Sequence, residues 1–239
     1  MISLAGLLVA LIAGGAAAIS GLGHRWEWWT FRQGFTLLRV AAWSGLGGAA
    51  VALVGGVLAR VKADRLGIVL AAVGLVLGLA VFSWPWHLAR TAKSVPAIHD
   101  ITTDTANPPV FSAIVPLRAG AANPLDYGGE EIARQQRQAY PDIRSLLLPV
   151  AADQAFRRAQ EVVRRLGWSA VTEDRQAGRI EAFDRTFWYG FIDDVVIRIA
   201  TVGSGSLVDV RSVSRVGRSD IGTNARRIRR FLAGMRKGE

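Results

Sequence analysis

Charged side chains interrupt the apolar pattern of the chain between residues 193 and 224. Three of them, Arg198, Arg211 and Arg215, carry guanidinium groups, which form paired hydrogen bonds with phosphates and carboxylates. Asp220 follows at the expected start of a helix, where backbone amides also favour an anion. These four residues are our candidates for binding an anionic ligand, a lipid headgroup or a protein partner.

The adjacent carboxylates Asp193 and Asp194 could bind a metal or act as an acid and a base. Neighbouring strand residues point to opposite faces, so this pair is poorly placed to act on one atom. We interpret the pair as part of a structural polar network, together with His99, Asp100 and Asn224. Two alternatives stay open for the anion candidates: Asp220 could cap its helix, and Arg211 could pair with an acid across the sheet.

Hydrolytic chemistry has little support in the sequence. A Ser–His–Asp hydrolase would need His99 to meet a serine such as Ser212 or Ser214, and no G-x-S-x-G elbow precedes a helix. The chain contains no cysteine, which excludes disulfides and thiol nucleophiles. We therefore predict no catalytic residue, no metal ligand and no cofactor.

The elements that position these residues lie in the second half of the chain. Residues 89–126 are rich in proline yet too apolar for a free linker, and we expect an extended arm docked on the domain at 127–239. Within that domain, hydrophobic spacing predicts helices at 130–138, 152–166 and 219–236 and strands near 168–172, 179–187, 195–199 and 208–212. This order predicts an α+β two-layer sandwich, a four-stranded antiparallel sheet with helices packed on one face.

The first 88 residues have a different composition. Three apolar runs, at 2–22, 40–59 and 66–86, are each long enough to cross a bilayer core about 30 Å thick. We predict a three-helix transmembrane domain over residues 1–88. Small residues could form a packing seam between the helices, or could simply be common in such segments; examples are Gly14, Gly15, Gly47, Gly48, Gly55 and Gly56.

The charge balance bears on partners and topology. The net charge of +10 raises the question of nucleic acid, but several basic residues flank the apolar runs, as in membrane proteins. The short link after the second run carries Arg60, Lys62 and Arg65, and its charge density favours the cytoplasm. We therefore expect a multi-pass protein of the bacterial inner membrane with its C-terminal domain in the periplasm.

Several separated motifs resemble one known family. They are IHDITTDTANPP at 98–109, AYPDI at 139–143, GRIEAFDRTFWYGFIDDVVIRI at 178–199 and VDVRSVSRVGRSDIGTNARRIRRF at 208–231. Together they resemble the bacterial and plastid family catalogued as domain of unknown function 1499, over about residues 95–236. The resemblance implies a membrane-associated or exported α+β domain, and it implies no established activity.

We expect a non-enzymatic protein whose domain binds a partner at the membrane surface. The partner would be a membrane or envelope protein complex or anionic lipid headgroups, and no nucleic acid is expected. One alternative is an enzyme or ligand-binding domain for an anionic small molecule or lipid headgroup, with Arg198, Arg211 and Arg215 holding the ligand. A third is a cytoplasmic nucleic-acid-binding domain.

Overall fold

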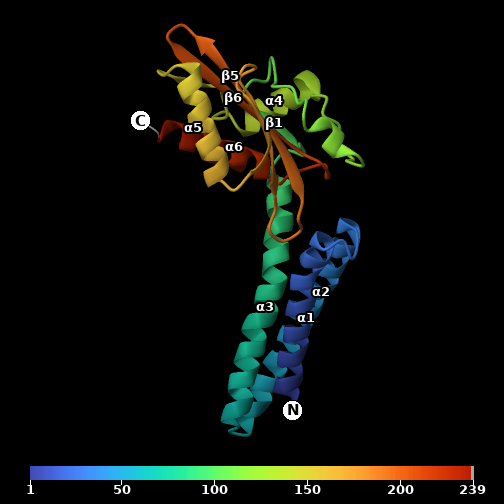
Figure 1. Ribbon diagram of the computed structural model, residues 1–239. Helices are drawn as coiled ribbons and strands as arrows, with labels where there is room; N and C mark the ends of the chain where they lie inside the picture. Colours follow the sequence, from blue (N-terminus) through green and yellow to red (C-terminus); the bar gives the residue numbers. More distant parts are fainter. Residues whose placement is uncertain (238–239) are drawn as a thin grey trace. The chain divides into compact units, whose positions relative to one another are not determined.

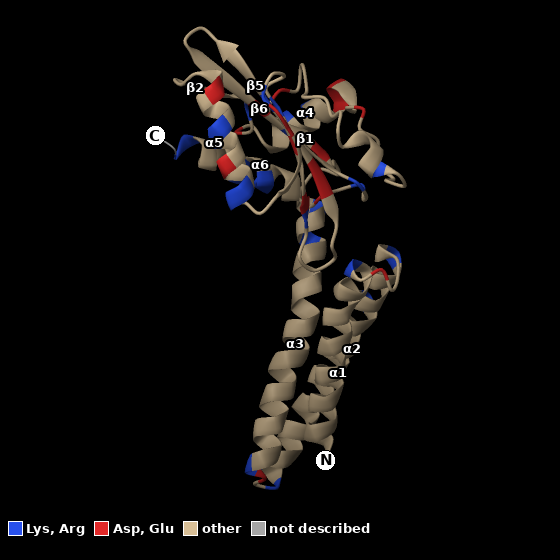
Figure 2. Ribbon diagram, viewed as in Figure 1, with Lys and Arg blue, Asp and Glu red and all other residues tan. Residues whose placement is uncertain are grey.

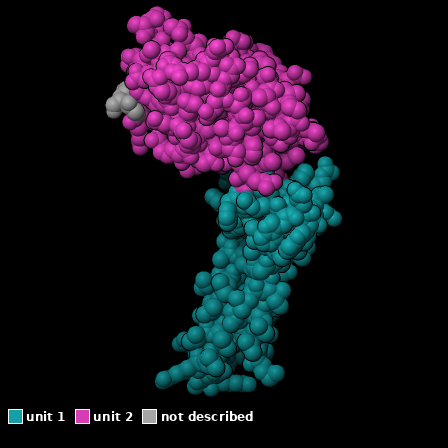
Figure 3. Space-filling model, viewed as in Figure 1, with its two compact units in different colours: residues 1–93, 187–190 teal, residues 94–186, 191–239 magenta. Residues whose placement is uncertain are grey.

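The computed structural model describes residues 1–237, which form two compact units. The first unit contains residues 1–93 together with residues 187–190, and the second contains residues 94–186 and 191–237 (Figure 3). The chain therefore leaves the second unit for four residues in the middle of its sequence and then returns to it.

Three long helices make up most of the first unit: α1 (Ile2–Arg25), α2 (Phe31–Val61) and α3 (Arg65–Ser94) (Figure 1). Each is long and apolar enough to cross a membrane, which confirms the three predicted helices. The helix α2 begins well before the predicted residue 40 because Thr30 and Gln33 form a capping box. The link between α1 and α2 is correspondingly short, at residues 26–30.

Glycines bring the three helices into close contact. A Cβ atom added at Gly6 would lie 2.4 Å from the backbone nitrogen of Ala52, and one at Gly78 would lie 2.4 Å from the carbonyl oxygen of Gly45. Gly55 is equally constrained, with Ser3 N at 2.5 Å. A packing seam of small residues therefore exists, but Gly15 and Gly47 from the predicted set face open space.

The four residues at 187–190 pack within the first unit. The indole N–H of Trp188 donates to the carbonyl oxygen of Ala18 at 2.9 Å, and the hydroxyl of Tyr189 lies 3.3 Å from Ser20 Oγ. A Cβ at Gly21 would lie only 2.7 Å from the Trp188 ring, so this glycine makes room for the indole. Trp188 and Tyr189 thus serve as packing residues of the first unit.

The second unit contains an antiparallel sheet of six strands in the order β1-β6-β5-β4-β3, with β2 also paired to β6. The strands are β1 (Asp100–Thr102), β2 (Leu146–Leu148), β3 (Ser169–Asp174), β4 (Arg179–Arg185), β5 (Ile192–Val202) and β6 (Gly205–Ser214). The four predicted strands are β3 to β6. The two further strands are short, and both pair with the outer edge of β6. The arm supplies β1, as an edge strand.

The two faces of this sheet are covered differently. The helices α5 (Ala152–Arg165) and α6 (Thr223–Arg236) cover one face, where Phe156 and Phe231 pack with Ile197 and Val210. The arm covers the other face, where Phe111 and Ile114 pack with Val196 and Val213. The remaining helices are η1 (Val115–Arg118) in the arm and α4 (Gly129–Ala139). The predicted α+β class is confirmed, and the arm covers the face of the sheet that lies opposite α5 and α6.

Candidate anion-binding site

The sheet sends the polar residues of β5 and β6 to opposite sides. Asp193 points toward α6, where its Oδ2 accepts a hydrogen bond from Arg227 at 2.7 Å. Asp194 points toward the arm, where it pairs with Arg118 and, at 2.8 Å, with Arg215. Both carboxylates are buried, so each ion pair satisfies a charge that would otherwise be costly inside the domain.

Arg211 ties the arm to the sheet. Its guanidinium donates to both carboxylate oxygens of Asp100, at 2.7 and 2.9 Å, and to the carbonyl oxygens of Pro109 and Leu125. Burial raises the pKa of the Asp100 carboxyl, although the guanidinium opposes this shift. Burial, helped by the charge of Asp100, also raises the pKa of Tyr127 to about 12.

Arg198 of β5 forms salt bridges with two carboxylates. It donates to Asp209 at 2.8 Å and to Asp104 at 2.9 Å. Burial works against its charge, but the hydrogen bonds to these two acids prevail and raise the pKa of Arg198. Asp209 also accepts from the hydroxyls of Thr103 and Ser145, so its charge is fully engaged.

Asn224 and Asp220 organise the start of α6. The amide of Asn224 donates to the carbonyl oxygen of His99 at 2.9 Å and accepts from the Ser212 hydroxyl at 2.7 Å. Asp220 accepts from the backbone N–H groups of Gly222 and Asn224, at 2.8 and 2.6 Å. Burial raises the pKa of the Asp220 carboxyl. Asp220 thus caps the first turn of α6, one of the two roles that the sequence left open.

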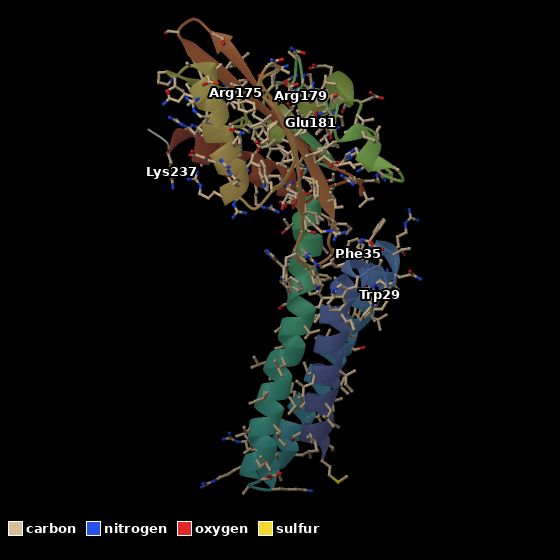
Figure 4. The ribbon with its side chains drawn as sticks, in the orientation of Figure 1. Trp29, Phe35, Arg175, Arg179, Glu181 and Lys237 are labelled. Carbon is tan, nitrogen blue, oxygen red and sulfur yellow. The ribbon has the colours of Figure 1, made fainter. Side chains whose placement is uncertain are left out.

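Two buried residues that the sequence analysis missed hold further parts of the arm and α4. Glu181 accepts the backbone N–H groups of Ser112 and Ile114, both at 2.9 Å, and lies 3.2 Å from Arg179 (Figure 4). Gln136 of α4 exchanges two hydrogen bonds with the backbone of Thr102. The one feature of the sequence that could have indicated a buried role for Glu181 is its position between Ile180 and Ala182, two core residues of β4.

The three candidate arginines do not converge on one ligand position. Arg198, Arg211 and Arg215 each face a different carboxylate or pair of carboxylates, so their charges are already matched inside the domain. Within residues 1–237, no group of three His, Asp or Glu side chains is arranged to hold a metal. An external anion would have to compete with buried acids for these guanidinium groups.

Arginines that lack such partners lie on α5 and α6 (Figure 2). Two exposed arginines of these helices form salt bridges, Arg157 with Asp153 and Arg229 with Asp142. The others form no salt bridge within the described part of the chain, and they are Arg164, Arg165, Arg226, Arg230 and Arg236. Most of the exposed arginines of the second unit without a salt bridge therefore lie on this helical layer, while Arg144, Arg185 and Arg218 lie elsewhere.

A cavity of about 390 Å³ opens among these residues at the start of α6. Its walls are Leu166, Trp168, Asp184, Thr223, Arg226, Arg227 and Arg230. Arg227 holds Asp184 at 2.8 Å, which offsets the one carboxylate of the wall. Arg226 donates to the Thr223 hydroxyl at 3.0 Å, and Arg230 lies one turn further along the helix. Two arginines one turn apart on α6, beside an apolar wall, suit a phosphate on an apolar body.

A larger cavity, of about 610 Å³, lies at the start of α5 and the hairpin turns. Its charged lining residues, Asp153 and Arg175, form a salt bridge with each other. Because its charges are matched, this cavity offers less to an anion than the one at α6. Sequence reasoning missed both cavities, since each combines residues from elements far apart in the chain.

The family model described as "Protein of unknown function (DUF1499)" matches residues 100–235. The matched region contains every strand of the sheet, the buried ion pairs and the cavity at α6. A comparison with curated proteins finds no match.

Proposed function

We propose that this chain, which belongs to the DUF1499 family of unknown function, is a non-enzymatic membrane-anchored binding protein. Its α+β domain would bind the phosphate groups of anionic lipids through the cavity at the start of α6. The observation that carries this proposal is the pair Arg226 and Arg230, which line the cavity and form no salt bridge with a described acid.

The internal ion pairs support a binding function over a catalytic one. The acids of the signature motifs, Asp100, Asp193, Asp194 and Asp209, are each bound to an arginine and buried. A general acid or base must reach its substrate, and these carboxylates are enclosed by their partners. The accessible charge of the domain is basic, which favours an anionic ligand.

The proposal includes the membrane orientation and the compartment of the protein. Three candidate spans precede the domain, and the basic link Arg60–Arg65 favours the cytoplasmic side for the turn between α2 and α3. The domain would then lie on the periplasmic side of a bacterial inner membrane. Anionic headgroups of that membrane are the nearest source of phosphate for a tethered domain.

Hydrogen exchange of the full chain in lipid nanodiscs tests the proposal. We expect the amides of residues 223–230 to exchange several-fold more slowly in phosphatidylglycerol discs than in phosphatidylcholine discs. The double variant Arg226→Ala/Arg230→Ala should lose this difference, because each arginine near a membrane surface contributes about 1 kcal/mol. Arg134→Ala/Arg137→Ala on α4 is the matched control, since both of these exposed arginines pair with glutamates.

Equal exchange in the two kinds of disc would refute lipid binding at this cavity. Protection that appears only when a native membrane extract is added, and that the double variant abolishes, would instead indicate an acidic protein partner.

A further inference from the structure

A second cavity of interest lies within the first unit, between α2 and α3. It measures about 250 Å³ and is lined on α2 by Gly56, Val57 and Arg60 and on α3 by Ile68, Ala72 and Leu75. Arg60 is the one charged residue among the described residues of its lining. The cavity is thus an apolar groove between two candidate membrane spans, with a cation in its wall.

Small residues create this groove. A Cβ at Gly56 would lie 3.0 Å from the Cβ of Ala71, so the two helices approach closely there. Ala72 lines the groove and is exposed, so a larger side chain at this position would fill the space. The volume is below the roughly 300–1,000 Å³ typical of sites for compact ligands, and it suits a slender chain better.

The turn that follows the groove is positively charged. Arg60, Lys62 and Arg65 are exposed and form no salt bridge with any residue in the described range. The nearby carboxylate of Asp64 accepts a hydrogen bond from the Gly67 N–H at 3.0 Å and so caps α3. Three cations within six residues at the end of an apolar groove complement an amphiphile that has an anionic head.

We propose that this groove binds one acyl chain of an anionic phospholipid, with the phosphate of that lipid held by Arg60. Lys62 and Arg65 would add to the attraction for the headgroup, since basic pockets between transmembrane helices bind such headgroups. The site is independent of the cavity at α6, because it uses residues of the other unit.

Native mass spectrometry of the full chain in detergent, titrated with dioleoyl phosphatidylglycerol or dioleoyl phosphatidylcholine, tests this site. The wild type should retain the anionic lipid at least about fivefold better, as expected for one cation near the headgroup. Arg60→Gln should reduce that preference about fivefold, whereas Ala72→Phe should weaken retention of both lipids. Glycerophosphoglycerol, which lacks acyl chains, should not displace the bound lipid.

Two substitutions outside the groove serve as controls. Arg39→Gln removes a different exposed arginine of α2, and Ala50→Phe enlarges an exposed alanine of α2. Both should leave lipid retention unchanged, and thermal melting should show that all four variants are folded. Equal retention of the two lipids by the wild type, or a preference that Arg60→Gln leaves undiminished, would overturn the proposal. Displacement of the lipid by glycerophosphoglycerol would also overturn it.

Discussion

Arg211 and Asp100 show how single residues hold this domain together. The guanidinium makes four hydrogen bonds, two of them to Asp100, and the rings of Phe111 and Tyr127 lie against it at 5.4 and 5.5 Å. Both charged groups are buried. Such a pair adds little over an apolar filling, but removal of one partner leaves the other charge unmatched.

We predict that Arg211→Met destabilises the second unit by about 3–5 kcal/mol, because the buried carboxylate of Asp100 loses its counter-charge. The double variant Asp100→Asn/Arg211→Met should recover part of that loss. Denaturant unfolding of the full chain in detergent measures both values. Arg134→Met should cost at most about 1 kcal/mol, since its bond to Glu131 is exposed. A loss as small for Arg211→Met would contradict the buried-pair account.

The carboxyl of Asp220 gives a prediction about pH. Burial raises its pKa in the folded state above the ordinary value of 3.8. A raised pKa means that the folded state binds the proton more tightly, so this group stabilises the fold in acid and loses that contribution as pH rises. The stability of Asp220→Asn relative to the wild type should therefore increase between about pH 4 and neutral pH.

Thermal melting of the two proteins at several pH values measures this difference. Any effect of the amide that does not depend on protonation shifts all melting temperatures equally, so the change of the difference with pH is what tests the raised pKa of Asp220. A difference that stays constant with pH would show that burial does not shift this carboxyl.

Residue types alone predicted part of the polar network. Strand alternation correctly placed Asp193 and Asp194 on opposite faces, and it allowed Arg211 to pair with an acid, which proved to be Asp100. The identity of the partners could not be read from the sequence. Arg118 and Arg227 reach Asp194 and Asp193 from elements more than thirty positions away, and no local pattern records such a distance.

At the scale of elements, the long periodic segments were predictable and the short ones were not. The helices α4 and α5 and the strands β3 to β6 lie close to their predicted positions. The strands β1 and β2 have three residues each, too few for a periodic signal, and they exist because β6 offers an unpaired edge. The predicted start of α6 at residue 219 was early, because Ser219–Gly222 form the capping turn.

The close packing of the three long apolar helices also gives a testable prediction. Gly6→Ala should lower the thermal stability of the first unit, because the added methyl group would lie 2.4 Å from the Ala52 nitrogen. Gly47→Ala should be neutral or slightly stabilising, since nothing lies within 4 Å of that position. Light scattering during a melt in detergent compares the two variants. Equal melting temperatures would contradict the close packing of α1 and α2.

At the scale of the whole molecule, composition separated an apolar first part from a charged second part, and the structure divides the chain near the same place. The sequence did not predict that residues 187–190 belong with the helices. Their contacts include Ala18 and Ser20, about 170 positions earlier in the chain. Only a three-dimensional arrangement can reveal a pairing of that separation.

The packing of residues 187–190 with the first unit has a consequence for truncated forms of the protein. A fragment that starts at residue 94 would keep Trp188 and Tyr189 but lose the helices against which they pack. We predict that this fragment self-associates through its bared aromatic rings, and that Trp188→Ser/Tyr189→Ser restores a monomer in analytical ultracentrifugation. A fragment that is monomeric without these changes would contradict the prediction. The chain thus passes between the two units three times, so no single truncation point separates them.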